Sequence, residues 1–318
     1  MGLKIIGTGK GIPETRISND DLAAFLETDD EWIVSRTGIK NRHVCTHETL
    51  TDLSVKAAMQ AIEKSGLAPD DIELIICATI GGDFRTPALA CCVLERIGAK
   101  CPAFDINAAC AGFIYSLEVA SGFLDAGKAK NVLIVCAEMM SMHMDWNDRN
   151  TCVLFGDGAS ACVVAGGNAL RFSRLSAIAD VSVLNLPSGT GNSPFIDNKR
   201  ENGFLRMQGQ EVFRFAVCVV ESEIKQALGA LNISEQQIDW FILHQANKRI
   251  IESVRMKLLQ PEMKFPINID RYGNVSSASI PLLLDEMLEE GKIKNGDTLF
   301  MTAFGAGLTV GTCVMVWE

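Results

Sequence analysis

The stretch Ala61-Ile-Glu-Lys-Ser-Gly-Leu-Ala-Pro-Asp-Asp-Ile-Glu-Leu-Ile-Ile-Cys77 has a counterpart 166 residues later, Ala227-Leu-Gly-Ala-Leu-Asn-Ile-Ser-Glu-Gln-Gln-Ile-Asp-Trp-Phe-Ile-Leu243. Each predicts the end of a helix, a turn and a short apolar strand. Gly66 and Asn232 occupy the same position in the two stretches, and glycine and asparagine most readily take the left-handed conformation that ends a helix. The match indicates that one structural unit occurs twice.

A second match supports the same repeat. Gly127-Lys-Ala-Lys-Asn131 is similar to Gly291-Lys-Ile-Lys-Asn295, and a short apolar strand is expected after each. Two matches in the same order favour an internal duplication over chance. We therefore predict two similar α/β halves, residues 1–168 and residues 169–318, which meet near residues 165–172.

Each half alternates amphipathic helices with short apolar runs that are hydrophobic on both faces. These runs are Ile72–Ile80, Val132–Ala137, Ala159–Ala165, Trp240–Leu243 and Thr298–Ala303. Strands of this kind predict sheets that helices cover on both sides. Loops are expected at Asp145–Thr151 and Asn185–Asn202, where Pro, Gly, Ser and Asn gather.

Composition and charge narrow the function classes. The chain has 318 residues, of which 48% are hydrophobic and 21% charged, as in an ordinary globular enzyme. Its net charge of −10 argues against bulk affinity for nucleic acid or an anionic membrane. Eleven irregularly spaced cysteines do not form a disulfide framework, and we find no apolar stretch typical of a signal peptide or membrane span. We expect a cytoplasmic protein.

One cysteine is a candidate nucleophile. Cys110 lies in Asp105-Ile-Asn-Ala-Ala-Cys-Ala-Gly-Phe-Ile-Tyr115, where small neighbours leave room for a substrate. The following apolar run, residues 111–124, predicts a buried helix, whose positive end would lower the pKa of a thiol in its first turn. The alternative is a buried structural cysteine, because free cysteine is among the most buried residue types.

Three further groups follow in the C-terminal half. His244 comes at the end of the apolar run Trp240–Leu243, a position that often carries catalytic groups in α/β folds. Asn274 lies in a turn rich in Gly and Ser, and the turn Ala303-Phe-Gly-Ala-Gly-Leu308 could aim a backbone N–H at an oxyanion. The alternatives are a core histidine, a capping asparagine and an ordinary tight turn.

The motifs Ala-Cys-Ala-Gly-Phe, His-Gln-Ala-Asn-Lys-Arg-Ile, Gly-Asn-Val-Ser-Ser-Ala-Ser and Ala-Phe-Gly-Ala-Gly occur in that order. With them, the chain resembles β-ketoacyl-acyl carrier protein synthase III, the initiating condensing enzyme of bacterial fatty acid synthesis, nearly end to end. The resemblance implies a thiolase-like α/β fold, two duplicated halves in a five-layer αβαβα arrangement, and usually a homodimer. It implies acyl-CoA as substrate, malonyl-acyl carrier protein as partner, and neither a permanently bound cofactor nor a metal.

The same resemblance assigns roles. Cys110 would take the acyl group from acyl-CoA, and His244 and Asn274 would stabilise the enolate formed when the malonyl group loses CO2. The N–H groups of Cys110 and Ala306 would hold the oxyanion. Phe304 and Thr86 would belong to the acyl pocket, Thr86 across the dimer interface, where its small size predicts primers longer than acetyl.

Substrate contacts carry over by position. Trp32 matches the residue that stacks on adenine, with Arg36 and Arg149 near the nucleotide and Asn247 on the pantetheine arm. The residues expected to dock the carrier protein are Arg214, Lys248, Arg249, Arg255 and Lys257, with Arg249 foremost. One departure is Gly305-Ala-Gly307, because the family commonly has three glycines there, so Ala306 must fit the turn with a methyl group.

Three other functions are weighed against this one. A synthase III-like enzyme of secondary metabolism would keep Cys110, His244 and Asn274. A cysteine protease can show the same order of Cys, His and Asn, but the flanking residues differ. A thiol redox or metal-binding protein is the non-enzymatic alternative, although the chain has no Cys-x-x-Cys pair.

Overall fold

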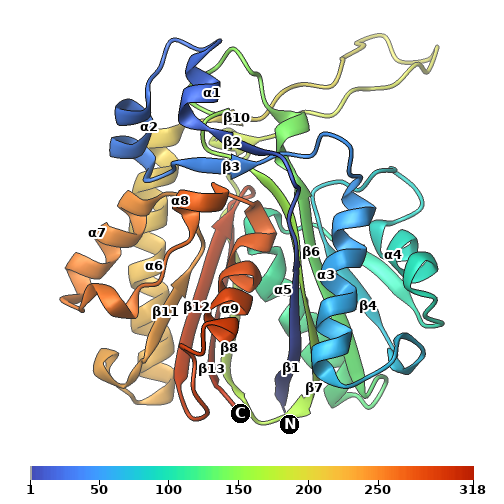
Figure 1. The fold of residues 1–318 in the computed structure, drawn as a ribbon, viewed down its shortest axis with the longest axis vertical. Helices are drawn as coiled ribbons and strands as arrows, with labels where there is room; N and C mark the ends of the chain where they lie inside the picture. Colours follow the sequence, from blue (N-terminus) through green and yellow to red (C-terminus); the bar gives the residue numbers. More distant parts are fainter. Residues whose placement is uncertain (1) are drawn as a thin grey trace.

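The computed structural model describes residues 2–318 as two sheets with helices between and outside them (Figure 1). The N-terminal half contains β1 (Gly2–Gly11), α3 (Leu50–Ser65), β4 (Ile75–Ala78), α4 (Leu89–Ile97), β5 (Ala103–Ile106), α5 (Gly112–Asp125), β6 (Asn131–Met139) and β7 (Asp157–Gly167). The C-terminal half contains β8 (Leu170–Ala177), α6 (Gly209–Leu231), β11 (Trp240–Leu243), α7 (Lys248–Leu258), α9 (Ser279–Glu289), β12 (Thr298–Gly305) and β13 (Thr309–Val316).

The two sheets have the same topology. The strand orders are β1-β7-β6-β4-β5 and β8-β13-β12-β11. The pairings of β4 with β6 and of β11 with β12 are parallel, and the next two pairings in each sheet are antiparallel. Strand β5, parallel to β4, extends the first sheet only. The predicted duplication is therefore confirmed. The boundary proposed at residue 168 lies in the turn between β7 and β8.

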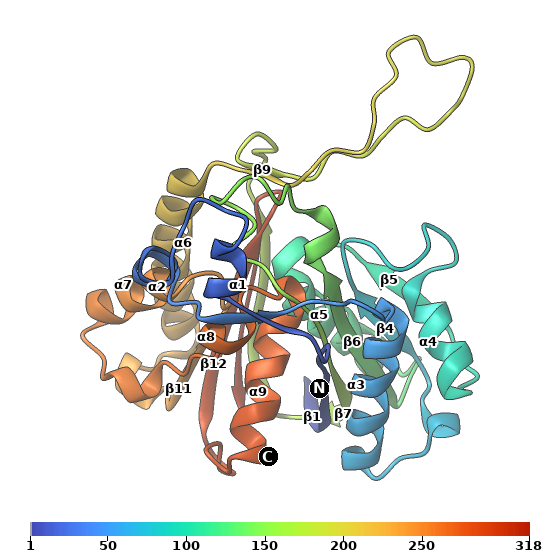
Figure 2. The same cartoon turned by 45° about the horizontal axis from the view of Figure 1, so that its top comes forward.

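The elements stack in five layers, as the resemblance implied. Helices α3 and α4 cover the outer face of the first sheet, and α6 and α7 cover the outer face of the second. Helices α5 and α9 lie between the sheets (Figures 1 and 2). Nine consecutive residues of α9 are buried, because it packs against both halves at once.

The ends of two helices confirm the repeat in detail. Gly66 ends α3 with φ 75°, and Asn232 ends α6 with φ 53°. The central helices α5 and α9 are preceded by one-turn 3-10 helices, Ala109–Ala111 and Ser276–Ala278, which contact each other. Ala109 (φ 47°) and Ser276 (φ 46°) are both left-handed, a conformation that costs an L-residue roughly 1–2 kcal/mol.

Shorter elements gather at one end of the sheets. They are β2 (Arg16–Ser18), α1 (Asn19–Ala23), α2 (Asp30–Thr37), β3 (Asn41–His43), β9 (Leu184–Asn185), β10 (Arg206–Met207) and α8 (Ile269–Tyr272). Elsewhere in the chain, one-turn helices occur at Pro69–Asp71, Met140–His143, Glu235–Gln237 and Glu262–Lys264. Residues 186–202 form a loop that extends away from the body (Figure 2). Both predicted loops are therefore confirmed, apart from Asn185, which ends β9.

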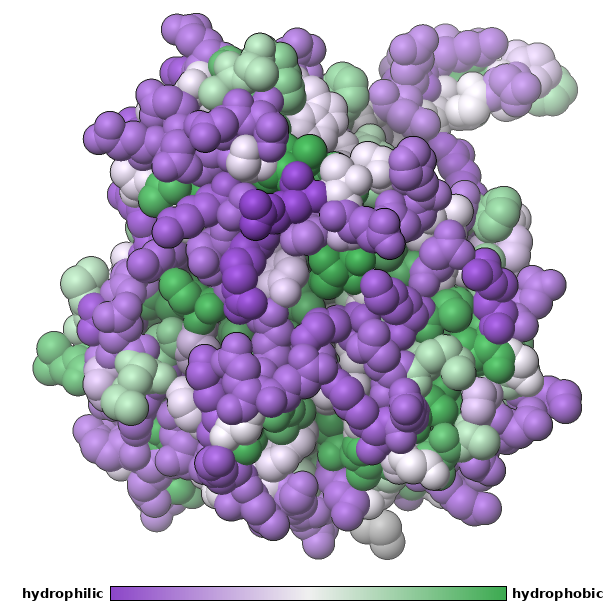
Figure 3. Space-filling model, viewed as in Figure 1, coloured by the Kyte–Doolittle hydropathy of each residue, from purple (hydrophilic) through white to green (hydrophobic). Residues whose placement is uncertain are grey.

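The face seen in Figure 3 is mostly hydrophilic, with small and separate apolar patches. Within residues 2–318, no helix combines the length and hydrophobicity needed to cross a membrane.

Candidate active site

A cavity of about 1290 Å³ opens where the two halves meet. It is lined by the three predicted catalytic side chains, Cys110, His244 and Asn274. Phe304 and Ala306, from the end of β12 and the turn after it, also line this cavity. Residues separated by up to 196 positions in the chain are thus brought to one site.

Cys110 lies in the 3-10 turn before α5, not in the first turn of the helix as predicted. Burial raises the pKa of its thiol to about 12, and the nearby Glu138 carboxyl adds to the rise, while the Ser276 hydroxyl opposes it. The predicted lowering of this pKa is therefore wrong. Desolvation outweighs the helix end here, because no cation lies among the groups that shift the pKa of this thiol.

His244 follows the last residue of β11 and is buried, with 2% of its surface exposed. Its Nδ1 lies 2.7 Å from Ser279 Oγ, and its ring contacts the Phe304 ring edge-on at 5.5 Å between centroids. Burial lowers the pKa of the imidazole to about 3, so His244 is neutral at physiological pH. If Ser279 donates to Nδ1, Nε2 carries the proton and can donate a hydrogen bond into the cavity.

Hydrogen bonds of the backbone N–H and of the side-chain oxygen hold Asn274 in place. Its N–H donates to Leu154 O (2.8 Å), and its Oδ1 accepts from Ser276 N–H (2.9 Å). The Nδ2 group is then the part of the amide left to donate to a ligand. Asn274 is therefore a neutral donor, as His244 is.

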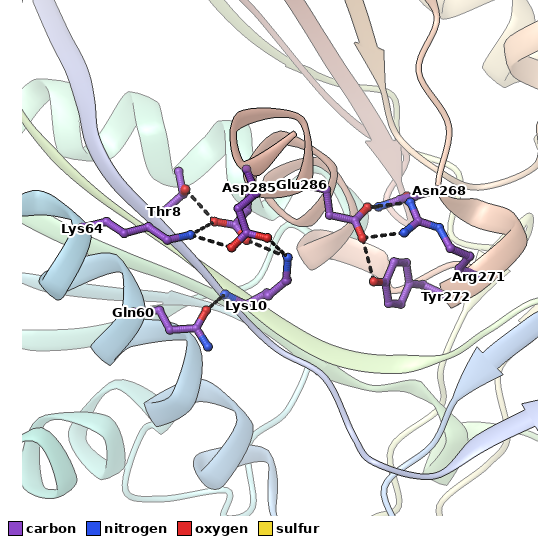
Figure 4. A network of polar contacts seen from close by, with 10 residues as sticks. Thr8, Lys10, Gln60, Lys64, Asn268, Arg271, Tyr272, Asp285 and Glu286 are labelled. Carbon is purple, nitrogen blue, oxygen red and sulfur yellow. Dashed lines mark hydrogen bonds and ion pairs between the residues drawn. The ribbon is translucent and has the colours of Figure 1, made fainter. Parts of the chain in front are cut away.

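A buried carboxylate anchors the segment before Asn274. Glu286 on α9 accepts hydrogen bonds from Asn268 Nδ2 (2.8 Å), from both terminal nitrogens of Arg271 (2.9 and 3.0 Å) and from Tyr272 Oη (2.7 Å) (Figure 4). Asn268 N–H also donates to Gln245 Oε1, at 3.2 Å. Since Gln245 follows His244, Glu286 connects the turn that carries His244 with the turn that carries Asn274.

The preceding residue, Asp285, points to the other half. It accepts hydrogen bonds from Thr8 Oγ1 and Lys64 Nζ, both at 2.7 Å, and pairs with Lys10 Nζ at 3.3 Å (Figure 4). Neighbouring carboxylates on α9 thus tie the C-terminal loops to β1 and α3. This holds the two halves of the site in fixed positions.

The turn between β12 and β13 lies against Cys110. A Cβ atom on Gly305 would be only 2.6 Å from Cys110 N, so glycine is required at this close approach. Gly307 has φ 139°, whereas Ala306 has no positive φ and accommodates its methyl group without backbone strain. Thr309 Oγ1 donates to Ala108 O at 2.9 Å and contacts Ala306 O at 3.2 Å, which clamps the two turns together.

The expected nucleotide-binding residues lie near the cavity mouth. Arg36 and Arg149 place their guanidinium groups over the Trp32 ring, 4.6 and 5.0 Å from its centroid. Trp32 and Arg36 line the cavity, and Arg149, which does not, is bonded to Glu27 O. Asn247 lines the cavity too, but its Oδ1 caps α7 and its Nδ2 donates to Arg36 O. Its contact with pantetheine stays a prediction.

The five basic residues divide into two groups. Arg214 and Arg249 are exposed and line the cavity; Arg214 pairs with Glu211 at 2.9 Å, and Arg249 has no ion-pair partner within residues 2–318. Arg255 pairs with Glu252 and Lys257 with Glu221, away from the cavity, while Lys248 packs against the position of Gly38. These contacts favour Arg214 and Arg249 over the other three as docking residues.

Thr86 lies in the exposed loop before α4 and does not line the cavity of its own chain. Any role in the acyl pocket would need a second copy of the chain, as the resemblance implies. Within the described chain, no cluster of three or more His, Cys, Asp or Glu side chains could hold a metal ion.

Three buried residues of the site were not found from the sequence. Ser279 contacts His244, whereas Ser276 lies beside the Cys110 thiol and donates to Glu138. The serines belong to the motif Gly-Asn-Val-Ser-Ser-Ala-Ser, in which only Asn274 was given a role. Glu138 could have been noticed, because it is a lone charge at the end of an apolar strand.

Two family models match the chain. One, described as 3-oxoacyl-[acyl-carrier-protein (ACP)] synthase III, covers residues 104–180, and the other, described as the C-terminal part of the same enzyme, covers residues 228–317. The β-ketoacyl-[acyl-carrier-protein] synthase III of Clostridium acetobutylicum is 44% identical over 320 aligned residues, which cover 99% of this chain and 98% of that protein.

Solved structures agree with these matches. The 3-oxoacyl-[acyl-carrier-protein] synthase III of Aquifex aeolicus superposes with a TM-score of 0.92 at 42% identity, covering 99% of this chain and 100% of that one. The priming β-ketosynthase of the R1128 polyketide pathway also gives 0.92, at 30% identity, covering 100% of this chain and 96% of that one.

Proposed function

The chain belongs to the 3-oxoacyl-[acyl-carrier-protein] synthase III family, and from this we propose that it condenses an acyl-CoA primer with malonyl-acyl carrier protein through an acyl thioester on Cys110. The products are 3-oxoacyl-acyl carrier protein, CoA and CO2. The observation that carries the proposal is the meeting of Cys110, His244 and Asn274 in one cavity.

In the first half-reaction, the Cys110 sulfur attacks the thioester carbon of acyl-CoA, and CoA leaves. Malonyl-acyl carrier protein then uses the same cavity, so the kinetics are ping-pong. The transfer needs an electrophile close to the sulfur, and the small residues Ala108 and Ala109 beside Cys110 line the cavity and leave that space. The primer ester remains on the enzyme until the second substrate arrives.

In the second half-reaction, loss of CO2 leaves negative charge on the malonyl thioester oxygen. The neutral His244 and the Nδ2 group of Asn274 donate hydrogen bonds to this oxygen. A neutral imidazole suits this role because its N–H can donate a hydrogen bond without any prior change in the protonation of the ring. Removing one such donor typically costs roughly 3 kcal/mol in the barrier.

The carbanion then attacks the acyl thioester on Cys110. The tetrahedral oxyanion accepts hydrogen bonds from the N–H groups of Cys110 and Ala306. The close approach of Gly305 to Cys110 N and the clamp from Thr309 support this pairing. Phe304 packs against His244 and lines the acyl end of the cavity.

For the CoA end, we propose that adenine stacks on Trp32 in place of one of the two guanidinium groups now over the ring. Arg214 and Arg249 at the cavity mouth supply positive charge for an acidic carrier protein. The active unit is a cytoplasmic homodimer without a resident cofactor. Strand β5 supports the dimer, since it ends its sheet without an outer neighbour among the described strands.

The proposal is tested by intact mass spectrometry after mixing the protein with acetyl-CoA and, separately, with butyryl-CoA. We expect one acyl adduct that is absent from Cys110→Ala and that is lost when malonyl-acyl carrier protein is added. Because Thr86 is small, butyryl-CoA should be turned over as well as acetyl-CoA. Strict preference for acetyl-CoA would contradict the primer prediction, and no adduct from either would contradict the function.

The second candidate is a priming synthase of secondary metabolism, because the R1128 enzyme superposes with the same TM-score of 0.92 as the Aquifex aeolicus synthase III, at 30% rather than 42% identity. Such an enzyme would form the same adduct but would transfer it preferentially to the carrier protein of a polyketide pathway. Comparing malonyl-loaded carrier proteins of the two pathways as acceptors separates the candidates.

A further inference from the structure

Ser279 is a buried serine at the start of α9 whose side chain meets the ring of His244. Only 3% of its surface is exposed, and its Oγ lies 2.7 Å from His244 Nδ1. Either group could donate in this hydrogen bond, since both a hydroxyl and a ring N–H are donors. The direction of the bond decides which nitrogen of the imidazole carries the proton.

The imidazole of His244 is neutral, because nothing around it would stabilise a charge. The residue is 2% exposed, and within residues 2–318 the hydrogen-bonding and aromatic contacts of its ring are the Ser279 hydroxyl and the Phe304 ring. No carboxylate is among them, and burial lowers the pKa of the ring. A neutral imidazole carries one N–H, either at Nδ1 or at Nε2.

The surroundings of the Ser279 hydroxyl favour one direction. A serine near the start of a helix often donates to a carbonyl of the preceding turn, but Ser279 makes no such bond. Its Oγ has His244 Nδ1 as its one hydrogen-bond partner in the described chain. If Nδ1 carried the proton, the hydroxyl hydrogen would be buried without an acceptor, which is costly. If the hydroxyl donates to Nδ1, this hydrogen is satisfied.

The other ring nitrogen then carries the proton and opens into the cavity. His244 Nε2 has no hydrogen-bond partner within residues 2–318, yet it is not one of the sealed side-chain atoms that lack a partner. Its surface is therefore reached from the cavity that His244 lines. A substrate oxygen placed there can accept the Nε2 hydrogen bond.

We propose that the Ser279 hydroxyl donates to His244 Nδ1 and thereby fixes the tautomer that carries its proton on Nε2, which makes Ser279 a positioning residue for the loss of CO2 from malonyl-acyl carrier protein. This inference rests on the proposed function, because that function gives His244 its role in the second half-reaction. The observations that carry it are the 2.7 Å contact and the lack of another acceptor for the hydroxyl among the described residues.

The choice of tautomer matters for the reaction. With the proton on Nε2, His244 donates to the enolate oxygen as CO2 leaves. With the proton on Nδ1, Nε2 would turn a lone pair toward the same oxygen and would oppose the charge that develops there. The edge-on contact of the ring with Phe304, at 5.5 Å between centroids, supports the orientation that Ser279 sets.

The first test observes the tautomer directly, by nitrogen NMR of protein labelled with ¹⁵N-histidine at about pH 7.5, where the imidazole is neutral. The chain has four histidines, and the His244 signals are those absent from His244→Asn. We expect a protonated Nε2 and an unprotonated, hydrogen-bonded Nδ1. In Ser279→Ala, the Nδ1 signal should shift toward that of a ring nitrogen without a hydrogen bond. A proton on Nδ1 of the wild-type protein would overturn the proposal.

The second test compares the two half-reactions in Ser279→Ala. The turnover number for decarboxylation of malonyl-acyl carrier protein should fall roughly 10-fold, the effect of losing one hydrogen bond, with little change in KM. Acylation of Cys110 by acetyl-CoA should stay within about twofold of wild type, because the first half-reaction does not use the His244 donor.

Ser160→Ala is the matched control. Ser160 is a fully buried residue of β7, and its hydroxyl donates to Ala278 O at 2.9 Å, next to Ser279 at the start of the same helix. Its replacement removes one buried hydrogen bond to α9 without touching His244. We expect both the His244 signals and the decarboxylation rate of Ser160→Ala to match those of wild type.

The remaining outcomes are distinct. Equal slowing of decarboxylation in Ser279→Ala and Ser160→Ala would show a structural effect and overturn the positioning role. A decarboxylation rate of Ser279→Ala within about twofold of wild type would overturn it as well. If wild type forms no acyl adduct, the proposed function fails, whereas the tautomer is read from the protein alone, so the two failures can be told apart.

Discussion

Replacing Gly305 by alanine should remove activity without changing any catalytic side chain. The added Cβ would lie 2.6 Å from Cys110 N and 2.9 Å from Ala109 Cβ, whereas ordinary contacts begin at 3.4 Å. The turn at Gly305 and the turn at Cys110 must then separate by about 0.8 Å. This displacement moves both expected oxyanion donors, and a misplacement of about 1 Å can cost roughly 100-fold in rate.

The assay is kcat/KM for condensation, with the rate of Cys110 acylation measured separately. Circular dichroism should show an intact fold, because overpacking costs only about 1–3 kcal/mol. Gly229→Ala in α6 is the matched control, since nothing lies within 4 Å of its new Cβ, and it should keep wild-type activity. If Gly305→Ala retained more than about half of the wild-type rate, the two turns would not form the oxyanion site as argued.

Four other outcomes are expected. Glu286→Ala should lower the free energy of unfolding by about 1–3 kcal/mol in a urea titration, because it leaves the buried Asn268 amide unpaired while the half-exposed Arg271 turns to water, whereas the half-exposed Glu289→Ala should cost about 1 kcal/mol or less. Gly229→Ala, exposed inside α6, should raise this free energy by about 0.5–1 kcal/mol, and a loss would contradict the open space around it. Burial lowers the pKa of folded His244 to about 3, so the unfolded state takes up a proton first as pH falls below 6.5. By about pH 5, the free energy of unfolding of wild type should therefore fall by about 2 kcal/mol relative to that of His244→Asn. Parallel curves of unfolding free energy against pH for the two proteins would refute this. Trp32→Ala should raise KM for acyl-CoA roughly 5- to 100-fold with little change in kcat, and an unchanged KM would remove the stacking role.

Much of the fold could be predicted because it depends on patterns within short segments of the sequence. The shared helix ends at Gly66 and Asn232 and the apolar runs before and after them are properties of short segments. The strand Trp240–Leu243 has the predicted bounds. Because a repeated sequence unit folds with the same topology, the 166-residue offset also predicts which elements of the second half match those of the first.

The site was predictable only where single residues stand out. Cys110 precedes a long apolar segment and His244 follows a short one, so both can be recognised in the sequence. Ser276, Glu138 and Glu286 could not be assigned, because their partners are far away in the chain: Glu138 bonds to a serine 138 residues later. The pKa of Cys110 was predicted in the wrong direction for the same reason, since burial depends on the tertiary fold.

The paired left-handed turns bear on the origin of the chain. Cys110 and Ser277 are the middle residues of turns that are 167 positions apart and in contact. A single-copy ancestor that dimerised about a twofold axis would have set two identical turns face to face. Gene fusion lifted that symmetry. One copy could keep the cysteine, and the other was free to place at the equivalent position a serine, Ser277, whose hydroxyl donates to Glu138 at 2.8 Å.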